Sequence, residues 1–144
     1  MRKIPQDILK IDPLKLDEEW MNQPGLFMYW AEKAAKARER ADRAKYLLER
    51  TTARVANMIR RDPDKFDLVK TTEAGINGAV QCHKDVFDAN KEFISARADS
   101  FVLEKLVIAL DHRRKALENL VYLHGQGYYS EPRRKERKVR GVKK

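Results

Sequence analysis

The stretch that decides the fold is LFMYWAEKAAKARERADRAKYLLERTTARVANMIRRDP, residues 26–63. Up to Arg61 it contains no Gly or Pro, and apolar or small residues recur at the spacing of one helix face. A proline disfavours helical geometry at the residue before it, so Asp62-Pro63 predicts the end of the helix. We therefore expect one helix over 26–61, about 55 Å long at 1.5 Å per residue. Its middle face is alanine, which buries little area alone, so it needs a packing partner.

A second helical pattern follows the charged loop after Pro63. Thr71 or Thr72 is suited to cap its start, and Gly125 is the expected cap at its end. A bend is possible near Asp99-Ser100, and nothing in the chain resembles a sheet.

The predicted fold is all-α, a long antiparallel helical hairpin with a C-terminal helix. Three segments are expected. Residues 1–25 form an irregular N-terminal arm that ends at Pro24-Gly25, residues 26–125 form the hairpin and oligomerisation helices, and residues 126–144 form a flexible basic tail that is too charged to pack.

Several classes of function lack support in the 144 residues. A single Cys82 excludes a disulfide framework and fits a reducing compartment. The N-terminus has no signal-peptide pattern and no stretch approaches a membrane span, so we expect a cytosolic protein without a membrane partner. Three scattered histidines predict no metal site, and no glycine-rich phosphate loop is present. The sequence therefore predicts a binding protein without cofactor or metal rather than an enzyme.

The net charge of +9 is unevenly distributed. Residues 32–61 carry ten Lys or Arg against four Asp or Glu, and residues 112–144 carry eleven against three. The segment between them is mildly acidic, with six basic and ten acidic residues. Two basic blocks of this kind suggest a polyanionic partner, although basic surfaces without one are common.

In the first helix the charges are sorted by side. We place the helix in a heptad register that has Ala34 and Ala41 at position a, and Ala37 and Ala44 at position d. In this register the c and g positions lie next to each other and form one stripe along the helix. Seven of these nine positions are basic and none is acidic. We call these seven residues the basic stripe: Lys33, Lys36, Arg40, Arg43, Arg50, Arg54 and Arg61.

The second helix leaves two interpretations of this stripe open. With Val80, Phe87, Ile94 and Phe101 at position a, the acidic residues of that helix face away from the hairpin seam, which favours an external anion. The alternative is that the stripe is solvated or pairs with acids, including those of a neighbouring subunit. The helix is also apolar outside that seam, at Val86 and Phe93 among others, so we expect a second copy of the chain to pack there.

Four features together resemble the UvsY-like recombination mediators of tailed phages. They are IDPLKL at 11–16, the pair Tyr29-Trp30, ARV at 53–55, and LEKLVIALDHRRKALENL at 103–120. The resemblance implies a non-enzymatic protein of the bacterial host cytoplasm that binds single-stranded DNA and forms ring-like homo-oligomers, hexamers or heptamers. It also implies help in loading a RecA-like recombinase onto strands coated by single-strand-binding protein.

The resemblance also implies roles for individual residues. The DNA-binding segment of the family, Lys-Ala-Arg-Leu, falls on TARV, so Arg54 matches its arginine and Thr52 replaces its lysine. The C-terminal helix of the family serves self-association. The predicted nucleic-acid-binding residues are Lys36, Arg40, Arg43, Arg50, Arg54, Arg60 and Arg61, and the predicted oligomerisation residues are Val86, Phe93, Leu106, Leu110, Leu117 and Leu120. The competing hypothesis is a structural or adaptor helical oligomer of a phage or bacterial assembly that binds acidic protein surfaces or RNA.

Overall fold

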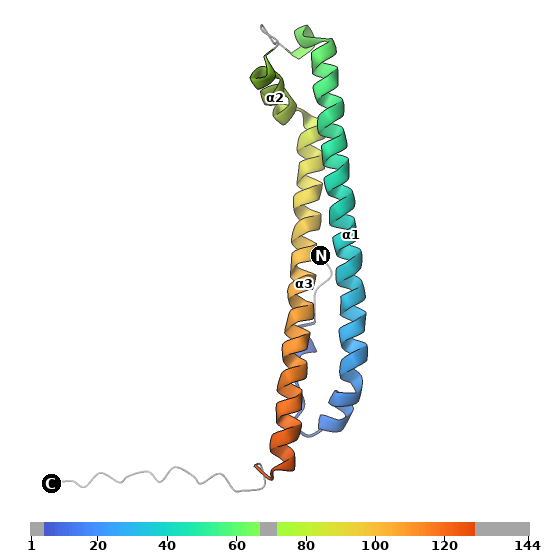
Figure 1. Cartoon of the computed structure of the whole chain (residues 1–144), viewed down its shortest axis with the longest axis vertical. Helices are drawn as coiled ribbons and strands as arrows, with labels where there is room; N and C mark the ends of the chain where they lie inside the picture. The colour runs from blue at the N-terminus through green and yellow to red at the C-terminus, as the bar shows by residue number, and fades with distance from the viewer. Residues whose placement is uncertain (1–4, 67–71, 129–144) are drawn as a thin grey trace, which may run out of the picture.

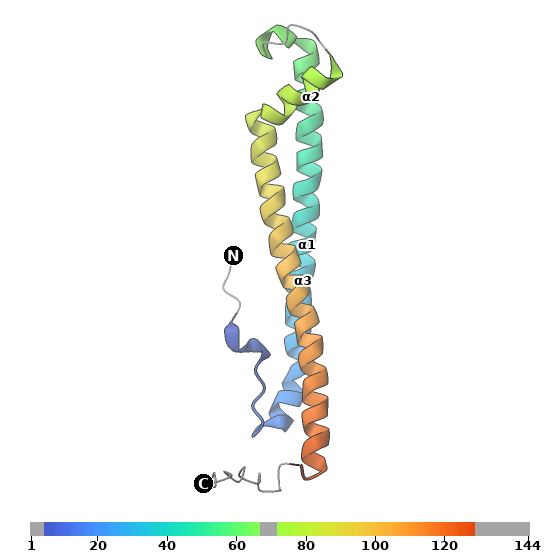
Figure 2. The ribbon, with the colours of Figure 1, turned by 90° about the vertical axis from the view of Figure 1, so that its left-hand side faces the viewer.

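The computed structural model describes residues 5–66 and 72–128, and the regular elements within these ranges are all helical. Two long helices run antiparallel and side by side, with a short helix at one end (Figure 1, Figure 2). The elements are η1 (Gln6–Leu9), α1 (Leu16–Arg61), η2 (Pro63–Phe66), α2 (Glu73–Cys82) and α3 (Lys84–Gly125). The prediction of an all-α chain built on a long helical hairpin is therefore confirmed.

The first helix begins earlier than predicted. α1 starts at Leu16 and runs through Pro24, so the irregular arm does not extend to Pro24-Gly25. Proline removes one backbone donor and bends a helix, and Figure 1 shows the first turns of α1 at an angle to the rest. A tertiary contact holds this segment, because the buried Gln23 donates from Nε2 to the Leu110 carbonyl at 2.9 Å.

The second helical pattern is interrupted at His83 rather than near Asp99-Ser100. Thr72 caps α2 by accepting from the Gly75 amide at 3.2 Å, as predicted for one of the two threonines. His83 has an extended backbone, and its Nδ1 accepts from the Asp85 amide at 3.2 Å, so it caps the start of α3. His83 therefore lies between two helices and caps the second, rather than continuing one helical pattern.

The break at His83 changes which residues of α3 face α1. Val80 is buried, as predicted. The prediction that the same heptad repeat continues from Val80 through α3 is wrong. The seam uses Val86, the half-buried Phe93, and Ser100. Phe87, Ile94 and Phe101, predicted to lie in the seam, are 58–62% exposed. Each is one residue beyond a seam position, about 100° further around the helix.

The core is divided between two clusters. At the turn of the hairpin, Val55 and Ile59 of α1 pack against Ile76, Val80 and Val86. In the middle, a cluster of small residues joins Ala41 and Ala44 to Ala96, with Phe93 at its edge. Small side chains let the two helix backbones approach closely, so the alanine face of α1 does meet a partner helix, as the sequence required.

The far end of α3 closes with a glycine two residues later than predicted. The helix ends at Gly125, but the residue with positive φ is Gly127, at 69°. The Gly127 amide bonds the His124 carbonyl, and the Tyr128 amide bonds the Leu123 carbonyl at 3.2 Å, which is a Schellman motif. No separate C-terminal helix occurs in the described residues, since α3 is continuous over 84–125. The predicted tail from residue 129 onward lies outside them.

Candidate nucleic-acid interface

The basic stripe lies along one flank of α1. From Lys33 to Arg61 it spans about 42 Å, at 1.5 Å per residue. Its members are exposed, except for the half-buried Lys33, whose Nζ lies 4.8 Å from the centre of the Tyr29 ring. Arg60 does not belong to this flank. It turns toward α2, where it forms an ion pair with Glu73 at 3.0 Å.

Two stripe arginines pair with acids of α3, contrary to the expectation that those acids face away. Arg54 meets Asp85 at 2.8 Å, and Arg40 meets Glu92 at 3.2 Å. The reason is the changed register of α3. Asp85 and Glu92 come one residue before the seam positions 86 and 93, so they project from the flank that faces the basic stripe. The alternative in which the stripe pairs with acids is therefore correct for these two arginines.

These ion pairs are weak because water reaches both side chains of each pair. The side chains of Arg54 and Asp85 are 67% and 50% exposed, and those of Arg40 and Glu92 are 63% and 59% exposed. Surface pairs of this kind contribute about 0–1 kcal/mol. In the part of the chain that the structure describes, Arg43 pairs within its own helix, with Glu39. These pairs therefore contribute little to holding the two helices together.

Three predicted contact residues have no acidic partner in contact among the described residues. Within 5–66 and 72–128, Lys36, Arg50 and Arg61 have no ion pair or hydrogen bond to an acid. Arg54 is the one charged residue of the TARV segment, and Val55 is fully buried in the core. Thr52 turns inward and donates its hydroxyl to the Leu48 carbonyl at 2.8 Å.

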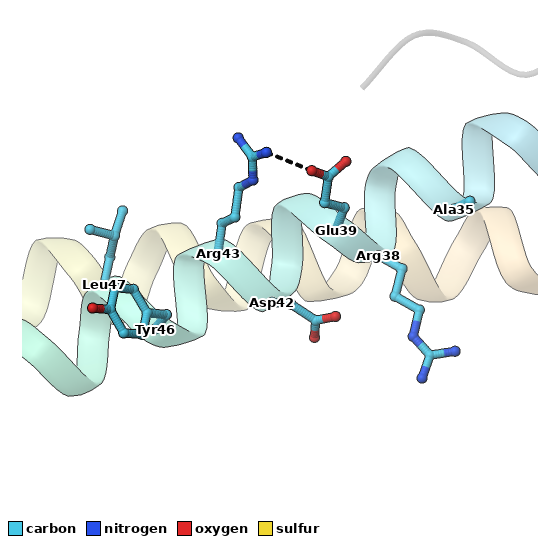
Figure 3. A pocket seen from close by; sticks show the side chains of 7 residues that line it. All are labelled: Ala35, Arg38, Glu39, Asp42, Arg43, Tyr46 and Leu47. Carbon is cyan, nitrogen blue, oxygen red and sulfur yellow. Dashed lines mark hydrogen bonds and ion pairs between the residues drawn. The ribbon is translucent and has the colours of Figure 1, made fainter.

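An open hollow lies on the outer surface of α1 beside the stripe, and Figure 3 shows it from close by. All of the side chains around it come from α1, and they enclose about 680 Å³ of shallow space. Tyr46 and Leu47 are 62% and 55% exposed there. The lining residues are Ala35, Arg38, Glu39, Asp42, Arg43, Tyr46 and Leu47.

The opposite flank of α3 is apolar. Four large side chains repeat every seven residues and are 47–62% exposed, and we call them the apolar ridge: Phe87, Ile94, Phe101 and Ile108. The acids at 85 and 92 precede the seam positions by one residue, whereas Phe87 and Ile94 follow them by one. The ridge and the acids thus lie on opposite sides of the seam. Since the acids pair with the basic stripe, the stripe and the apolar ridge lie on opposite flanks of the hairpin. The ridge has cations beside it, and Lys105 Nζ lies 5.1 Å from the centre of the Phe101 ring.

The predicted oligomerisation residues lie mostly inside the subunit. Leu110 and Leu117 are fully buried, and Val86 and Leu106 are at most 8% exposed. Phe93 and Leu120 are half-buried. The assignment of Val86, Leu106, Leu110 and Leu117 to an intersubunit surface is therefore corrected, because their side chains fill the interior of a single chain. For the half-buried Phe93 and Leu120 it stays a prediction. Exposed large apolar side chains remain on the apolar ridge and also near the start of α1, at Trp20, Met21, Phe27, Met28 and Tyr29.

A buried polar cluster fixes the N-terminal arm, and it was missed from the sequence. Arg113 is 7% exposed and donates to Gln23 Oε1, to Glu19 Oε2 and, at 3.0 Å, to the Lys10 carbonyl. The Asp12 backbone N–H donates to Glu19 Oε1 at 3.1 Å. This bond is the main cause that lowers the pKa of Glu19. Burial opposes it, and the nearby Arg113 adds to it. The only signal in the sequence was an arginine within an otherwise leucine-lined helix face.

The described residues hold no group of three or more His, Cys, Asp or Glu side chains placed to bind a metal ion. Cys82 is exposed and has no disulfide partner there. Among the helices that the structure describes, none combines the length and apolar character needed to cross a membrane.

No protein-family model, no curated protein and no solved structure matches this chain. The resemblance to UvsY-like mediators therefore depends on the sequence features alone.

Proposed function

We propose that this protein is a non-enzymatic, single-stranded DNA-binding recombination mediator that acts as a homo-oligomer in the cytoplasm of a bacterial host. The observation that carries the proposal is the basic stripe. It offers cations along about 42 Å of one flank, and the acids that touch it among the described residues form exposed ion pairs.

Binding by such a stripe is electrostatic. Lys and Arg side chains replace the counterions of the phosphate backbone, so affinity falls steeply with salt and depends little on base sequence. One subunit has few contacts and binds weakly. An oligomer that presents several stripes to one strand binds tightly, because each further contact is intramolecular. The proposed partners, a RecA-like recombinase and single-strand-binding protein, rest on the resemblance to UvsY-like mediators.

The test is fluorescence anisotropy with labelled single-stranded and duplex oligonucleotides of equal length over a salt series. The key variant replaces Lys36, Arg50 and Arg61 by alanine. If all three contact phosphates, the slope of log K against log salt becomes shallower by about 2, at about 0.7 per contact for single strands.

The matched control removes three charges from the other face. Lys91, Arg97 and Lys105 lie beside the apolar ridge, and their replacement by alanine changes the net charge equally. The slope of this control should match that of the wild-type protein. Because Lys105 Nζ lies 5.1 Å from the centre of the Phe101 ring, light scattering is used to verify that the control assembles as the wild-type protein does. Equal losses in both variants, or tighter binding to duplex than to single strands, would overturn the proposal.

The homo-oligomer is proposed to form through the apolar ridge of a second copy. A ridge that repeats every seven residues is the pattern by which one helix packs along another. Light scattering should find an assembly for the wild-type protein and a monomer for the variant with Phe87, Ile94 and Phe101 changed to Gln. An assembly that survives these changes would exclude the ridge as its contact.

The ridge also favours the second candidate function, a structural or adaptor oligomer that binds other proteins. If the protein assembles but binds neither single-stranded DNA nor RNA near 100 mM salt, this candidate replaces the mediator.

A further inference from the structure

Tyr46 stands on the outer surface of α1 between two stripe cations. It follows Arg43 by three residues and precedes Arg50 by four, so both arginines are its neighbours on the helix surface, with Cβ atoms about 5–6 Å away. Its side chain is 62% exposed. A strand whose phosphates followed Arg43 and Arg50 would carry its bases past this ring.

Among the described residues, no hydrogen bond or aromatic contact fixes the position of the Tyr46 ring. In residues 5–66 and 72–128, Tyr46 has no aromatic partner, no cation over its face and no hydrogen bond from its hydroxyl. Tyr29 provides the contrast, since it packs edge-on against Trp30 at 5.3 Å and carries Lys33 over its face. The face of the Tyr46 ring is thus available to a ligand.

The hollow beside Tyr46 has an arginine and an acid on each side. In Figure 3, Arg43 projects with Glu39 and Leu47 on one side of the helix, and Asp42 projects with Arg38 on the other, with Tyr46 between the two sides. Arg43 pairs with Glu39 at 2.6 Å, but both side chains are more than half exposed, so this pair is weak. A strand that followed Arg43 and Arg50 would leave the space above Tyr46 and Leu47 for a flat apolar group.

We propose that Tyr46 is a stacking platform for an unpaired nucleobase. This inference rests on the proposed function, and it adds a reason for preferring single strands to duplex. The phosphates of both ligands can meet the basic stripe, but only an unpaired base is free to turn out and stack on an exposed aromatic ring. Tyr46 is then the residue that distinguishes the two ligands.

The test compares Tyr46→Ala and Tyr46→Trp with the wild-type protein by anisotropy. The probes are labelled oligothymidylate and an abasic oligonucleotide of equal length, which keeps the phosphates and lacks the bases. Tyr46→Ala should bind oligothymidylate about tenfold more weakly, within the range found for loss of one stacking contact, and Tyr46→Trp should retain binding. Binding to the abasic strand and the salt slope should not change, because no phosphate contact is lost.

The control is Tyr122→Ala, which removes an equally exposed tyrosine near the far end of α3. Alanine is a good helix former, and unchanged far-ultraviolet circular dichroism would establish that both variants fold. Wild-type affinity of Tyr46→Ala for oligothymidylate, or an equal loss on the abasic strand, would overturn the inference while the proposed function stood. If the wild-type protein binds no single strand, the proposed function fails and the inference fails with it.

Discussion

Arg113 and Arg114 are neighbours in α3 with the same chemistry and different surroundings, and they permit a matched stability test. The Arg113 side chain is 5% exposed and holds Glu19, Gln23 and the Lys10 carbonyl. The Arg114 side chain is 47% exposed, and its ion pairs lie within its own helix. Changing Arg113 to alanine leaves buried acceptors without a donor, and loss of one partner of a buried pair costs about 3–5 kcal/mol.

The lower end of this range applies because Glu19 is 24% exposed, so water can reach part of its carboxylate. We expect Arg113→Ala to lower the free energy of unfolding by about 3 kcal/mol, and Arg114→Ala by less than about 1 kcal/mol. In a urea titration followed by circular dichroism, 3 kcal/mol moves the midpoint by about 1.5 M if the slope is about 2 kcal/mol/M. Hydrogen exchange should also show faster exchange in residues 7–23 for Arg113→Ala alone. Equal midpoints for the two variants would refute the assignment of a stabilising role to this cluster.

Three further predictions concern the acid stability of the Glu19 cluster, the release of Arg40 from its ion pair, and the burial of Ile59. The lowered pKa of Glu19 means that its contribution to stability is complete above its unfolded pKa, about 4.3, and is lost as pH falls through the folded value. The difference in urea midpoint between pH 7 and pH 3 should therefore shrink in Glu19→Gln. Glu92→Gln frees Arg40 from its surface pair and should raise affinity for single-stranded DNA by about two- to fivefold, a change that anisotropy can measure. Ile59→Ala should cost about 2–5 kcal/mol in urea denaturation because Ile59 is fully buried, and the 41% exposed Met58 provides a control with a smaller loss.

The sequence predicted helix ends correctly where neighbouring residues alone determine them. The proline at 63 ended α1 at Arg61, and a threonine capped α2, because both effects act within a few residues. Pro24 was misinterpreted for the same reason. A proline usually breaks a helix, and here the buried Gln23 holds the segment through a residue 87 positions away in sequence. Such a contact has no local signature.

The candidate site was predicted in part. The basic stripe follows from periodicity within one uninterrupted helix, so its members do lie on one flank of α1. The phase of α3 could not be obtained in this way. His83 resembles an ordinary helical residue in the sequence, but as a cap it interrupts the repeat, and each later position shifts by one residue relative to the seam. That shift brought Asp85 and Glu92 to the stripe and placed the ridge residues outside.

The structure of the seam gives a physical reason for this choice of phase. Two sets of side chains could have faced α1: Val86 with Phe93, or Phe87 with Ile94. The second set has the larger side-chain volume. In the middle of the hairpin, however, α1 presents Ala41 and Ala44, which lie against Ala96. Close approach of the two backbones favours small residues, so the seam takes Ala96 and Ser100 and leaves Phe101 outside.

The energetic consequence falls on the apolar ridge. Full burial of a Phe or Ile side chain is worth about 1.5–3 kcal/mol, and each of the four ridge residues is about half exposed in a single hairpin. A second hairpin that covered the ridge would recover several kcal/mol without disturbing the seam. Because the ridge lies on the flank opposite the stripe, such an assembly would leave the cations of every subunit open to a strand. Self-association and binding of single-stranded DNA are thus compatible on this fold, and a variant that loses the ridge should lose avidity while each subunit keeps its salt-dependent contacts.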